Sequence, residues 1–300
     1  MAWEFDSPLG HQLGYLRLKQ MSRIPFTITM DKNLLKKVDS IVDGRKIRNR
    51  SHALEYLTSS YFKPSVKKAL ILAGGKGVKM RPFTFELPKT MLPIKGIPIL
   101  EHIIELLRSH EVRDIYISIG YLGDKIKMHF GNGSKFAVKI HYLEEKNDLG
   151  TGGALKKAMP KFGKDPFVML WGDVLADIDL GDFTAFHLES SPLMSIALTS
   201  VADPTDYGAV KIRRDTVVEY IEKPKKSAAL SHLVSAGVHI VDPKVEKYFP
   251  KTSKFNLERD VIPKLIGDKK IKGYVFANQW FDVGTPQIYQ RAIKEWKKAR

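Results

Sequence analysis

Cysteine is absent from this chain of 300 residues. Its absence excludes disulfides, thiolate zinc sites, iron–sulfur clusters and cysteine nucleophiles. Long apolar runs are also missing: no stretch approaches the ~20 residues that cross a bilayer, and the N-terminus lacks the basic-then-apolar pattern of a signal peptide. Acidic residues are scarce beside basic ones, 33 against 49, which leaves a net charge of +16. We therefore expect a cytoplasmic protein, without membrane contacts, that binds polyanions such as nucleic acid or phosphorylated substrates.

The composition changes along the chain and predicts a domain boundary near residue 65. Residues 1–66 hold 11 Lys and Arg against 6 Asp and Glu, and the rest of the chain holds 38 against 27. Pro64 would end a helix, because proline lacks an amide proton and restrains the residue before it. Residues 1–20 have little periodicity and are expected to form a flexible extension. With 43% hydrophobic residues, the chain has enough apolar side chains for a substantial core.

Residues 21–66 carry the pattern of a strand followed by two helices. From Ile24 to Met30, apolar side chains alternate with two threonines, as in a half-buried strand. Asp31 can cap a following helix, and Asn49 or Ser51 can cap a second one. A unit of this size is too small to bury a full core alone, so we expect it to pair with a second copy.

This order resembles the ribbon-helix-helix family of DNA-binding domains, and the matching stretch is FTITMDKNLLKKVDSIVDGRKIRNRSHALEYLTSSYF. In that family the strands of two chains pair into a ribbon that enters the major groove, and the second helices hold phosphates at their N-termini. The resemblance implies that Thr27 and Thr29 face the bases. It also implies phosphate contacts by Asn49, Arg50 and Ser51, beside a basic cluster that contains Arg45, Lys46, Arg48 and Arg50. Dimerisation without DNA binding is the alternative.

Residues 67–300 alternate between strand and helix patterns. A continuous apolar run ends at Ala73 and leads directly into three closely spaced glycines. That arrangement is typical of an α/β sheet that binds a phosphate at the carboxyl end of a strand. Further strands are expected at 114–120, 138–143, 167–171, 195–201 and 238–241, and helices at 99–109, 152–159 and 288–298. The alternation predicts a doubly wound, mostly parallel sheet.

Two common phosphate-binding motifs do not fit these glycines. The dinucleotide pattern G-x-G-x-x-G would need its third glycine where Met80 stands, and the sequence contains no P-loop. The longer string LAGGKGVKMRPFTFELPKTMLPIKGIPILEHII instead resembles the signature of sugar-1-phosphate nucleotidyltransferases. Further motifs follow in that family's order: LGTGGAL at 149–155, GD at 172–173, EKP at 222–224, SAG at 235–237, LERDVIP at 257–263 and WFDVGTP at 280–286. The resemblance covers residues 68–296 and implies the family's Rossmann-like sheet.

The resemblance implies a reaction in which a sugar 1-phosphate attacks the α-phosphorus of a nucleoside triphosphate and releases pyrophosphate. Such chemistry needs cations and close backbone approach rather than a general base, because the sugar phosphate is already ionised at neutral pH. The residues implied for nucleotide binding are Leu72, Ala73, Gly74, Gly75 and Gly77. The implied catalytic cations are Lys79, Arg81 and Lys89. The family usually has arginine at position 79, and lysine keeps its charge but loses its planar fork.

The later motifs imply a metal site and a sugar site. By resemblance, Asp173 and Asp282 hold Mg²⁺ between the two substrates, since two carboxylates together with phosphates and waters suit this ion. Glu222 would bind sugar hydroxyls and Lys223 the sugar phosphate. Gly237 belongs to the segment that faces the sugar.

The choice of nucleobase is expected to depend on Glu145, five residues before Gly150, which belongs to the same nucleotide site. Many uridylyl- and thymidylyltransferases carry glutamine at this position. An ionised carboxylate only accepts hydrogen bonds, which suits the N1–H and N2–H₂ edge of guanine. The sequence therefore favours GTP, while uridine and thymidine nucleotides stay open and the sugar is not identified.

Two functional hypotheses compete. The first is a Mg²⁺-dependent sugar-1-phosphate nucleotidyltransferase that forms a homodimer or higher oligomer through residues 21–66. The second is a DNA-binding transcriptional regulator whose transferase-like domain only senses a nucleotide or a sugar phosphate. The lysine at position 79 favours the regulator slightly. The presence of Lys89, Asp173, Lys223 and Asp282 favours the enzyme more strongly.

Overall fold

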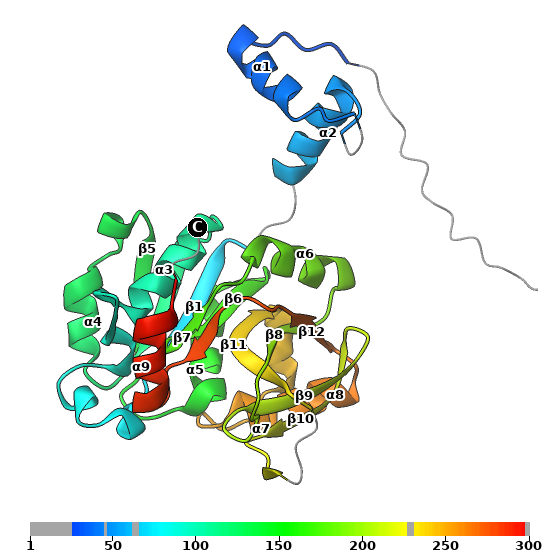
Figure 1. The fold of residues 1–300 in the computed structure, drawn as a ribbon. Coiled ribbons are helices and arrows are strands. Elements are labelled where there is room, and N and C mark those ends of the chain that lie inside the picture. The colour runs from blue at the N-terminus through cyan, green and yellow to red at the C-terminus, as the bar shows by residue number, and fades with distance from the viewer. Residues whose placement is uncertain (1–25, 45–46, 62–65, 227–230, 298–300) are drawn as a thin grey trace, which may run out of the picture. The chain divides into compact units, whose positions relative to one another are not determined.

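The computed structural model describes residues 26–44, 47–61, 66–226 and 231–297. The chain divides into two compact units, Met1–Phe62 and Lys63–Arg300 (Figure 1). The extension expected over residues 1–20 lies outside the described residues, as do Arg45 and Lys46 of the basic cluster.

The small unit contains two helices, α1 (Lys32–Ser40) and α2 (Arg50–Tyr61). As predicted, the Asp31 carboxylate caps α1 by accepting the backbone N–H groups of Asn33 and Leu34, at 2.8 and 3.2 Å. The Asn49 side chain caps α2, where its Oδ1 accepts the backbone N–H of His52. Both helix starts therefore follow from side chains that satisfy otherwise unpaired amides.

The strand expected over residues 24–30 is not present in the described part of that range, since residues 26–30 have no strand assignment. A ribbon strand needs a partner strand for its hydrogen bonds, and the described residues of this unit contain none.

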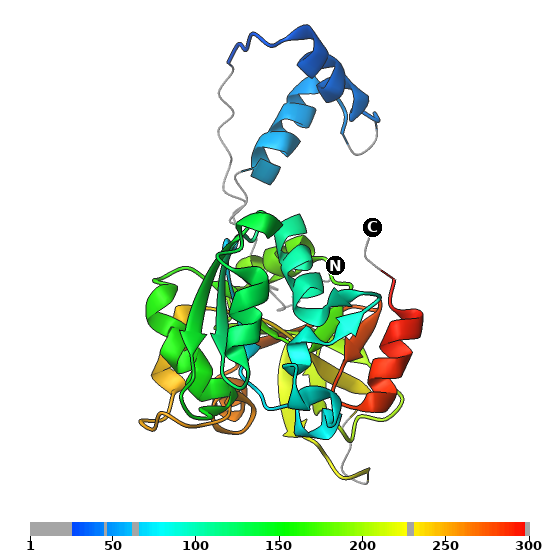
Figure 2. The ribbon, with the colours of Figure 1, turned by 90° about the vertical axis from the view of Figure 1, so that its left-hand side faces the viewer.

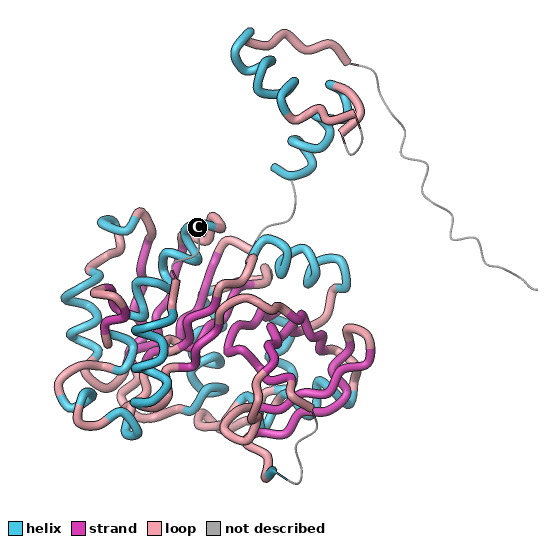
Figure 3. Tube along the Cα trace, viewed as in Figure 1, coloured by secondary structure: helices cyan, strands magenta, loops and turns pink. Residues whose placement is uncertain are grey.

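The large unit is built on one sheet of nine strands in the order β5-β4-β1-β6-β11-β8-β12-β10-β9. Figure 3 shows the strands in magenta between the helices. The strands are β1 (Lys68–Ala73), β4 (Asp114–Ile119), β5 (Lys139–Glu144), β6 (Phe167–Trp171), β8 (Met194–Ser200), β9 (Gly208–Arg213), β10 (Thr216–Glu222), β11 (Leu233–Val241) and β12 (Ile271–Val275). Two small sheets pair β7 (Val174–Ala176) with β13 (Trp280–Asp282), and β2 (Pro93–Ile94) with β3 (Ile97–Pro98).

The sheet is mixed, which corrects the prediction of a mostly parallel one. The four strands β5, β4, β1 and β6 run parallel to one another. β11 then enters antiparallel between β6 and β8, and the β9–β10 hairpin adds antiparallel pairs at the far edge. The hairpin is possible because only Arg214 and Asp215 separate the two strands, and Arg214 adopts a left-handed φ of 58°.

Helices flank the sheet (Figure 2). They are α3 (Ile99–Ser109), α4 (Gly123–Phe130), α5 (Gly150–Ala158), α6 (Leu180–Ser190), α7 (Leu257–Asp260), α8 (Ile262–Gly267) and α9 (Pro286–Glu295). Short 3₁₀ helices are η1 (Val78–Met80), η2 (Phe83–Phe85), η3 (Lys89–Met91), η4 (Ser134–Phe136), η5 (Met159–Lys161) and η7 (Pro243–Tyr248). α5 packs against β1 and β4, whereas α8 packs against β10 and β12. Among the described residues, no helix is both long and apolar enough to cross a membrane.

The four parallel strands place four chain segments at one edge of the sheet. Ala69, Leu70 and Ile71 in β1 are fully buried, as expected for a central strand covered on both faces. Ala73 pairs with Ile119, the last residue of β4. The residues that follow β1, β4, β5 and β6 therefore converge, and this convergence positions the site described next.

Candidate active site

A cleft of about 1120 Å³ lies at this edge of the sheet. Its walls come from the loop after β1, the ends of β4, β5 and β6, the start of α5, and the ends of β10 and β13. Segments distant in sequence thus line one cavity large enough for two small substrates.

The glycine loop after β1 is held in place by polar and apolar contacts. Gly77 adopts a left-handed φ of 60°, and the Thr84 hydroxyl donates to its carbonyl at 2.8 Å. A Cβ at position 77 would lie 3.0 Å from the Thr84 Cγ2 atom and 3.1 Å from the Lys89 Cβ atom. Met80 is fully buried and anchors the loop to the core. Glycine is therefore required at position 77 both for conformation and for space.

Five lysines line the cleft: Lys76, Lys79, Lys89, Lys146 and Lys223. Lys89 forms an ion pair with Asp173, and both side chains are only about one-fifth exposed. Burial alone disfavours the Lys89 ammonium, but the negative charges of Asp173 and Asp282 outweigh it and raise the pKa of Lys89. Lys89 is thus held as a cation inside the cleft.

Asp173 and Asp282 are brought together by the small β7–β13 sheet. Val283, which follows β13, donates its backbone N–H to the Asp173 carbonyl at 2.9 Å. Burial, followed by the charge of Asp173, raises the pKa of Asp282 to about 7, against the opposing effect of Lys89, Lys223 and Lys79. The described residues contain no cluster of three or more His, Asp or Glu side chains able to hold a metal ion. A cation here would need further oxygen ligands from a substrate or water.

Glu222 and Lys223 stand at the end of β10 and line the cleft. The Tyr220 hydroxyl donates to the Glu222 Oε2 atom at 3.0 Å, and the Lys223 Nζ atom lies 3.7 Å from the Glu222 Oε1 atom. Lys223 has a left-handed φ of 49° and donates its backbone N–H to the Tyr207 carbonyl at 2.9 Å. A non-glycine residue held in this conformation is often part of a functional site.

Glu258, in α7, is a buried carboxylate that also lines the cleft. The Thr151 hydroxyl donates to its Oε2 atom at 2.6 Å, and burial raises its pKa above the ordinary value. Thr151 also accepts the backbone N–H of Leu257 at 3.0 Å, which ties α5 to α7. At Gly150, an added Cβ would lie 2.6 Å from the Phe255 carbonyl oxygen. The glycines of LGTGGAL thus allow close packing of α5 against residues 253–257.

Three residues that the sequence assigned to the site do not line the cleft. Ala73 is buried in the core at the end of β1. The Arg81 guanidinium lies over the Phe85 ring, 5.0 Å from its centroid. A Cβ at Gly237 would lie 2.6 Å from the Trp171 ring, so glycine at this position allows close packing against Trp171. The remaining nucleotide, sugar-phosphate and metal residues that the sequence named all line the cleft.

Sequence reasoning missed several cleft residues. Lys76 lies between Gly75 and Gly77, and this position in the glycine loop was enough to predict that it lines the cleft. Trp171 directly precedes the GD motif. Thr151 lies within the LGTGGAL motif but was given no role, whereas Tyr207 carries no pattern that separates it from surface residues, and only the fold brings it to the cleft.

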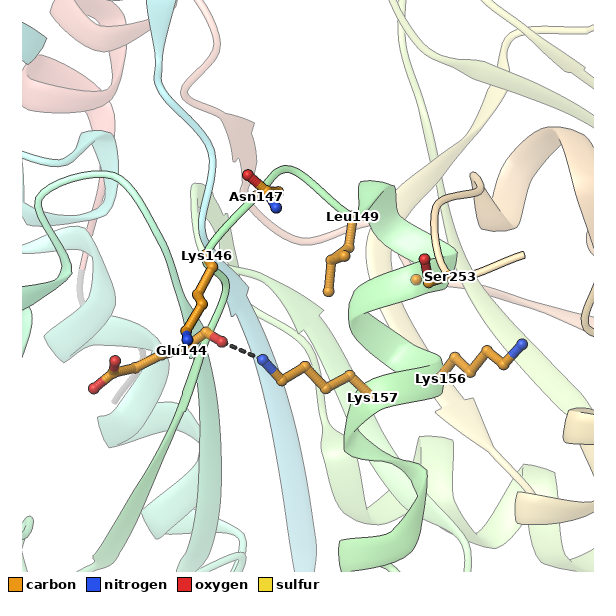
Figure 4. A pocket seen from close by; sticks show the side chains of 8 residues that line it. Glu144, Lys146, Asn147, Leu149, Lys156, Lys157 and Ser253 are labelled. Carbon is orange, nitrogen blue, oxygen red and sulfur yellow. Dashed lines mark hydrogen bonds between the residues drawn. The ribbon is translucent and has the colours of Figure 1, made fainter. Parts of the chain in front are cut away.

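A second, smaller cavity of about 410 Å³ lies beside residues 144–149 (Figure 4). Three lysines line it, Lys146, Lys156 and Lys157. Lys156 donates to the carbonyls of Pro250, Lys251 and Thr252, and Lys157 donates to the carbonyl of Glu144. These two ammonium groups therefore hold the backbone at residues 250–252 and at Glu144 against α5.

The residues expected to contact DNA are placed as follows. Thr27, Thr29, Arg48 and Ser51 are exposed. Asn49 serves as the cap of α2. The Arg50 guanidinium donates to both carboxylate oxygens of Asp39, at 2.6 and 2.8 Å. Arg50 therefore ties α2 to α1 in this structure.

Comparison with known proteins identifies the family to which this chain is similar. The family model described as nucleotidyl transferase matches residues 68–299. The D-glycero-α-D-manno-heptose 1-phosphate guanylyltransferase of Aneurinibacillus thermoaerophilus is 32% identical over 228 residues, covering 76% of this chain and 97% of that protein. The mannose-1-phosphate guanylyltransferase of Mycobacterium tuberculosis is 33% identical over 226 residues, which cover 74% of this chain but only 62% of that longer protein.

Solved structures agree with the sequence relatives. HddC from Yersinia pseudotuberculosis superposes with a TM-score of 0.67 at 28% identity, covering 77% of this chain and 100% of that one. HddC in complex with GMP-PN gives a TM-score of 0.66 at 27% identity. The match over residues 68–299, together with these likenesses, shows that the chain belongs to the nucleotidyl transferase family.

Proposed function

We propose that the chain joins a nucleoside triphosphate to a sugar 1-phosphate and releases pyrophosphate. The observation that carries this proposal is the convergence, in one cleft, of a glycine loop, five lysines and the carboxylates of Asp173 and Asp282. Relatives that carry out such transfers are named for mannose 1-phosphate, heptose 1-phosphate and glucose 1-phosphate substrates.

The proposed step is an in-line displacement at phosphorus. A phosphate oxygen of the sugar 1-phosphate forms a bond to the α-phosphorus, and the bond from the α-phosphorus to the bridging oxygen of the β-phosphate breaks. No proton has to be removed from the nucleophile, because it is already an anion. Lys79 and Lys89 would neutralise charge on the triphosphate, while Lys223 would hold the sugar phosphate.

Asp173 and Asp282 are the residues that would hold Mg²⁺. Their fit rests on the donor set, because both carboxylates line the same cleft. Burial, and then repulsion from Asp173, raise the pKa of Asp282. A divalent cation would relieve that repulsion, and when bound it supplies additional charge neutralisation for the phosphates.

We further propose GTP as the nucleotide. Glu145 lines the cleft, and its backbone N–H donates to the Ile119 carbonyl at 2.7 Å. A carboxylate accepts two donors, and only guanine offers two adjacent donors on its Watson–Crick edge. The names of two relatives, both guanylyltransferases, agree with this choice.

The experiment that tests the enzyme function is a matrix of each nucleoside triphosphate against several sugar 1-phosphates, with Mg²⁺ and with pyrophosphate and the nucleotide sugar both quantified. Turnover with at least one pair supports an enzyme. Tight nucleotide binding without turnover by any pair would favour the competing hypothesis of a regulator that only senses the nucleotide. Lys79, which replaces the family's usual arginine, is the feature that favours this competitor.

For the small unit we propose pairing of two copies in the ribbon-helix-helix manner. The exposed apolar side chains of Phe26, Ile28 and Leu34 support it, because a monomer of two helices leaves them in water. Sedimentation of a Phe26→Glu/Ile28→Glu variant should show a lower mass than the parent chain. An unchanged mass would overturn this pairing.

DNA binding by the paired unit is a separate proposal. Arg48 is exposed beside the start of α2, where phosphates would dock. Salt-dependent binding to duplex DNA should weaken in an Arg48→Ala variant, while Arg50→Ala would also disturb the Asp39 contact. If the Arg48→Ala variant binds DNA at low salt with unchanged affinity, the surface around Arg48 is not the DNA contact. No binding by the parent chain would leave a dimerisation unit only.

A further inference from the structure

Ser118 and Gly74 fix the Glu145 carboxylate from two sides. Ser118 lies in β4 and is fully buried. Its hydroxyl donates to the Glu145 Oε1 atom at 2.6 Å. A Cβ added to Gly74 would lie 3.0 Å from the same Oε1 atom and 3.2 Å from the Cδ atom. The carboxylate therefore lies directly over the Gly74 backbone, with one oxygen held from the interior of the sheet.

The main chain of Glu145 is fixed as well. Its N–H donates to the Ile119 carbonyl at 2.7 Å, which continues the β4–β5 pairing by one residue. Ile119 directly follows Ser118, so the hydroxyl and the carbonyl that hold Glu145 come from consecutive residues. The last two residues of β4, Ser118 and Ile119, therefore fix the positions of both the side chain and the backbone of Glu145.

We propose that Ser118 is a positioning residue for nucleobase selection. The Ser118 hydroxyl occupies one lone pair of the Glu145 Oε1 atom. The other lone pair of Oε1 and the Oε2 atom stay available to accept hydrogen bonds from a base in the cleft. A carboxylate fixed in this way matches a base with two adjacent N–H donors. It opposes uracil or thymine, whose single N–H lies between two carbonyl oxygens that would face the carboxylate.

This inference rests on the proposed assignment of the nucleotide to this cleft, and it is separable from turnover. Without the Ser118 hydroxyl, Glu145 keeps its charge but loses the contact that selects one rotamer. The change should weaken binding of guanine nucleotides and leave binding of uracil nucleotides nearly unaffected, since a uracil base gains nothing from the fixed carboxylate.

Equilibrium binding of GTP and UTP, measured by calorimetry without any sugar phosphate, tests the inference on the full chain. In a Ser118→Ala variant the Kd for GTP should rise about tenfold, the value expected for one hydrogen bond to a charged group. The Kd for UTP should change less than about twofold on the same grounds. In a Glu145→Gln background, the same Ser118→Ala change should lose its effect on GTP.

Ser195→Ala is the matched control. Ser195 is also fully buried, and its hydroxyl pairs with the His187 Nδ1 atom at 2.9 Å, away from the cleft. It should leave the ratio of GTP to UTP affinity unchanged. The inference is overturned if the parent chain does not prefer GTP, or if Ser118→Ala weakens GTP and UTP equally. Absence of turnover in the parent chain, with the affinity ratio behaving as stated, would instead count against the proposed enzyme alone.

Discussion

The ammonium group of Lys89 is paired with the carboxylate of Asp173 inside the cleft, with 20% of the lysine and 19% of the aspartate side chain exposed. The two residues come from distant parts of the chain, since Lys89 begins η3 and Asp173 directly precedes β7. A buried pair of this kind contributes little net stability, because desolvation offsets much of the attraction. Its presence is better explained by the proposed function, in which a cation and a carboxylate that would bind Mg²⁺ are held side by side in the cleft.

Replacement of Lys89 by methionine should reduce kcat/KM on the order of 10²–10³-fold, as loss of one charge-stabilising group does. Steady-state kinetics on the most active substrate pair would measure this. Lys272→Met is the matched control, because Lys272 forms a similar pair with Asp215 at 2.7 Å, with 21% of its side chain exposed, outside the cleft. Equal losses in the two variants would mean that the Lys89 effect is structural.

Replacement of Asp282 by asparagine should raise the Mg²⁺ concentration needed for half-maximal activity about tenfold or more, because a neutral amide is a weaker ligand for a hard cation. A titration of initial rate against Mg²⁺ would measure the shift. Asp215→Asn serves as the control carboxylate outside the cleft. An unchanged Mg²⁺ titration in Asp282→Asn would exclude this residue as a ligand.

The sequence predicted the half of the fold that carries the glycine loop, and missed much of the other half. The strand at 167–171 and the helix at 99–109 were predicted with the observed bounds, because each is a strong apolar pattern with clear ends. β9 and β10 carry alternating polar residues and several charges, and no expectation was made for them. Their place depends on pairing with distant β11 and β12, which no local pattern encodes.

The sequence predicted site residues that lie within family motifs, but not the side-chain positions that depend on packing in the fold. Lys89, Asp173 and Asp282 were found from their motifs, and all three line the cleft. Arg81 belongs to the same motif, yet its side chain stacks on Phe85. Ser118 has no motif at all, because its importance arises only from the β4–β5 register.

Replacement of Gly150 by alanine should destabilise the protein more than replacement of Gly163. Both glycines have a left-handed φ, 70° and 67°, so each alanine should cost about 1–2 kcal/mol. Gly150 adds a clash with the Phe255 carbonyl, whereas a Cβ at Gly163 meets nothing within 4 Å. The additional cost should be about 1–3 kcal/mol, measured by urea unfolding. Equal effects would mean that the α5 contact relaxes freely.

The free energy of unfolding should fall as pH drops below about 6.5. Burial lowers the pKa of His187 to about 4, against the opposing charge of Asp242, and burial likewise lowers that of His239 to about 4. The unfolded chain binds these protons first, so stability is full above pH 6.5 and decreases toward pH 4. The slope should be up to about 1.4 kcal/mol per pH unit for each histidine.

A His187→Gln variant separates this effect from general acid denaturation. Glutamine does not titrate and can still pair with Ser195, so the variant should lose part of the pH dependence between pH 6.5 and 4. Urea midpoints at several pH values would measure it. Parallel profiles for the parent chain and the variant would contradict the assignment.

Pyrophosphate release from GTP with Mg²⁺ and a set of sugar 1-phosphates, including mannose and heptose 1-phosphates, tests the central claim most directly. The proposed function predicts release that depends on the sugar phosphate, in one-to-one ratio with a guanosine-diphosphate sugar identified by mass. It also predicts loss of both products in Lys89→Met. Absence of product with every sugar phosphate and every nucleoside triphosphate, from protein that binds nucleotide, would contradict it.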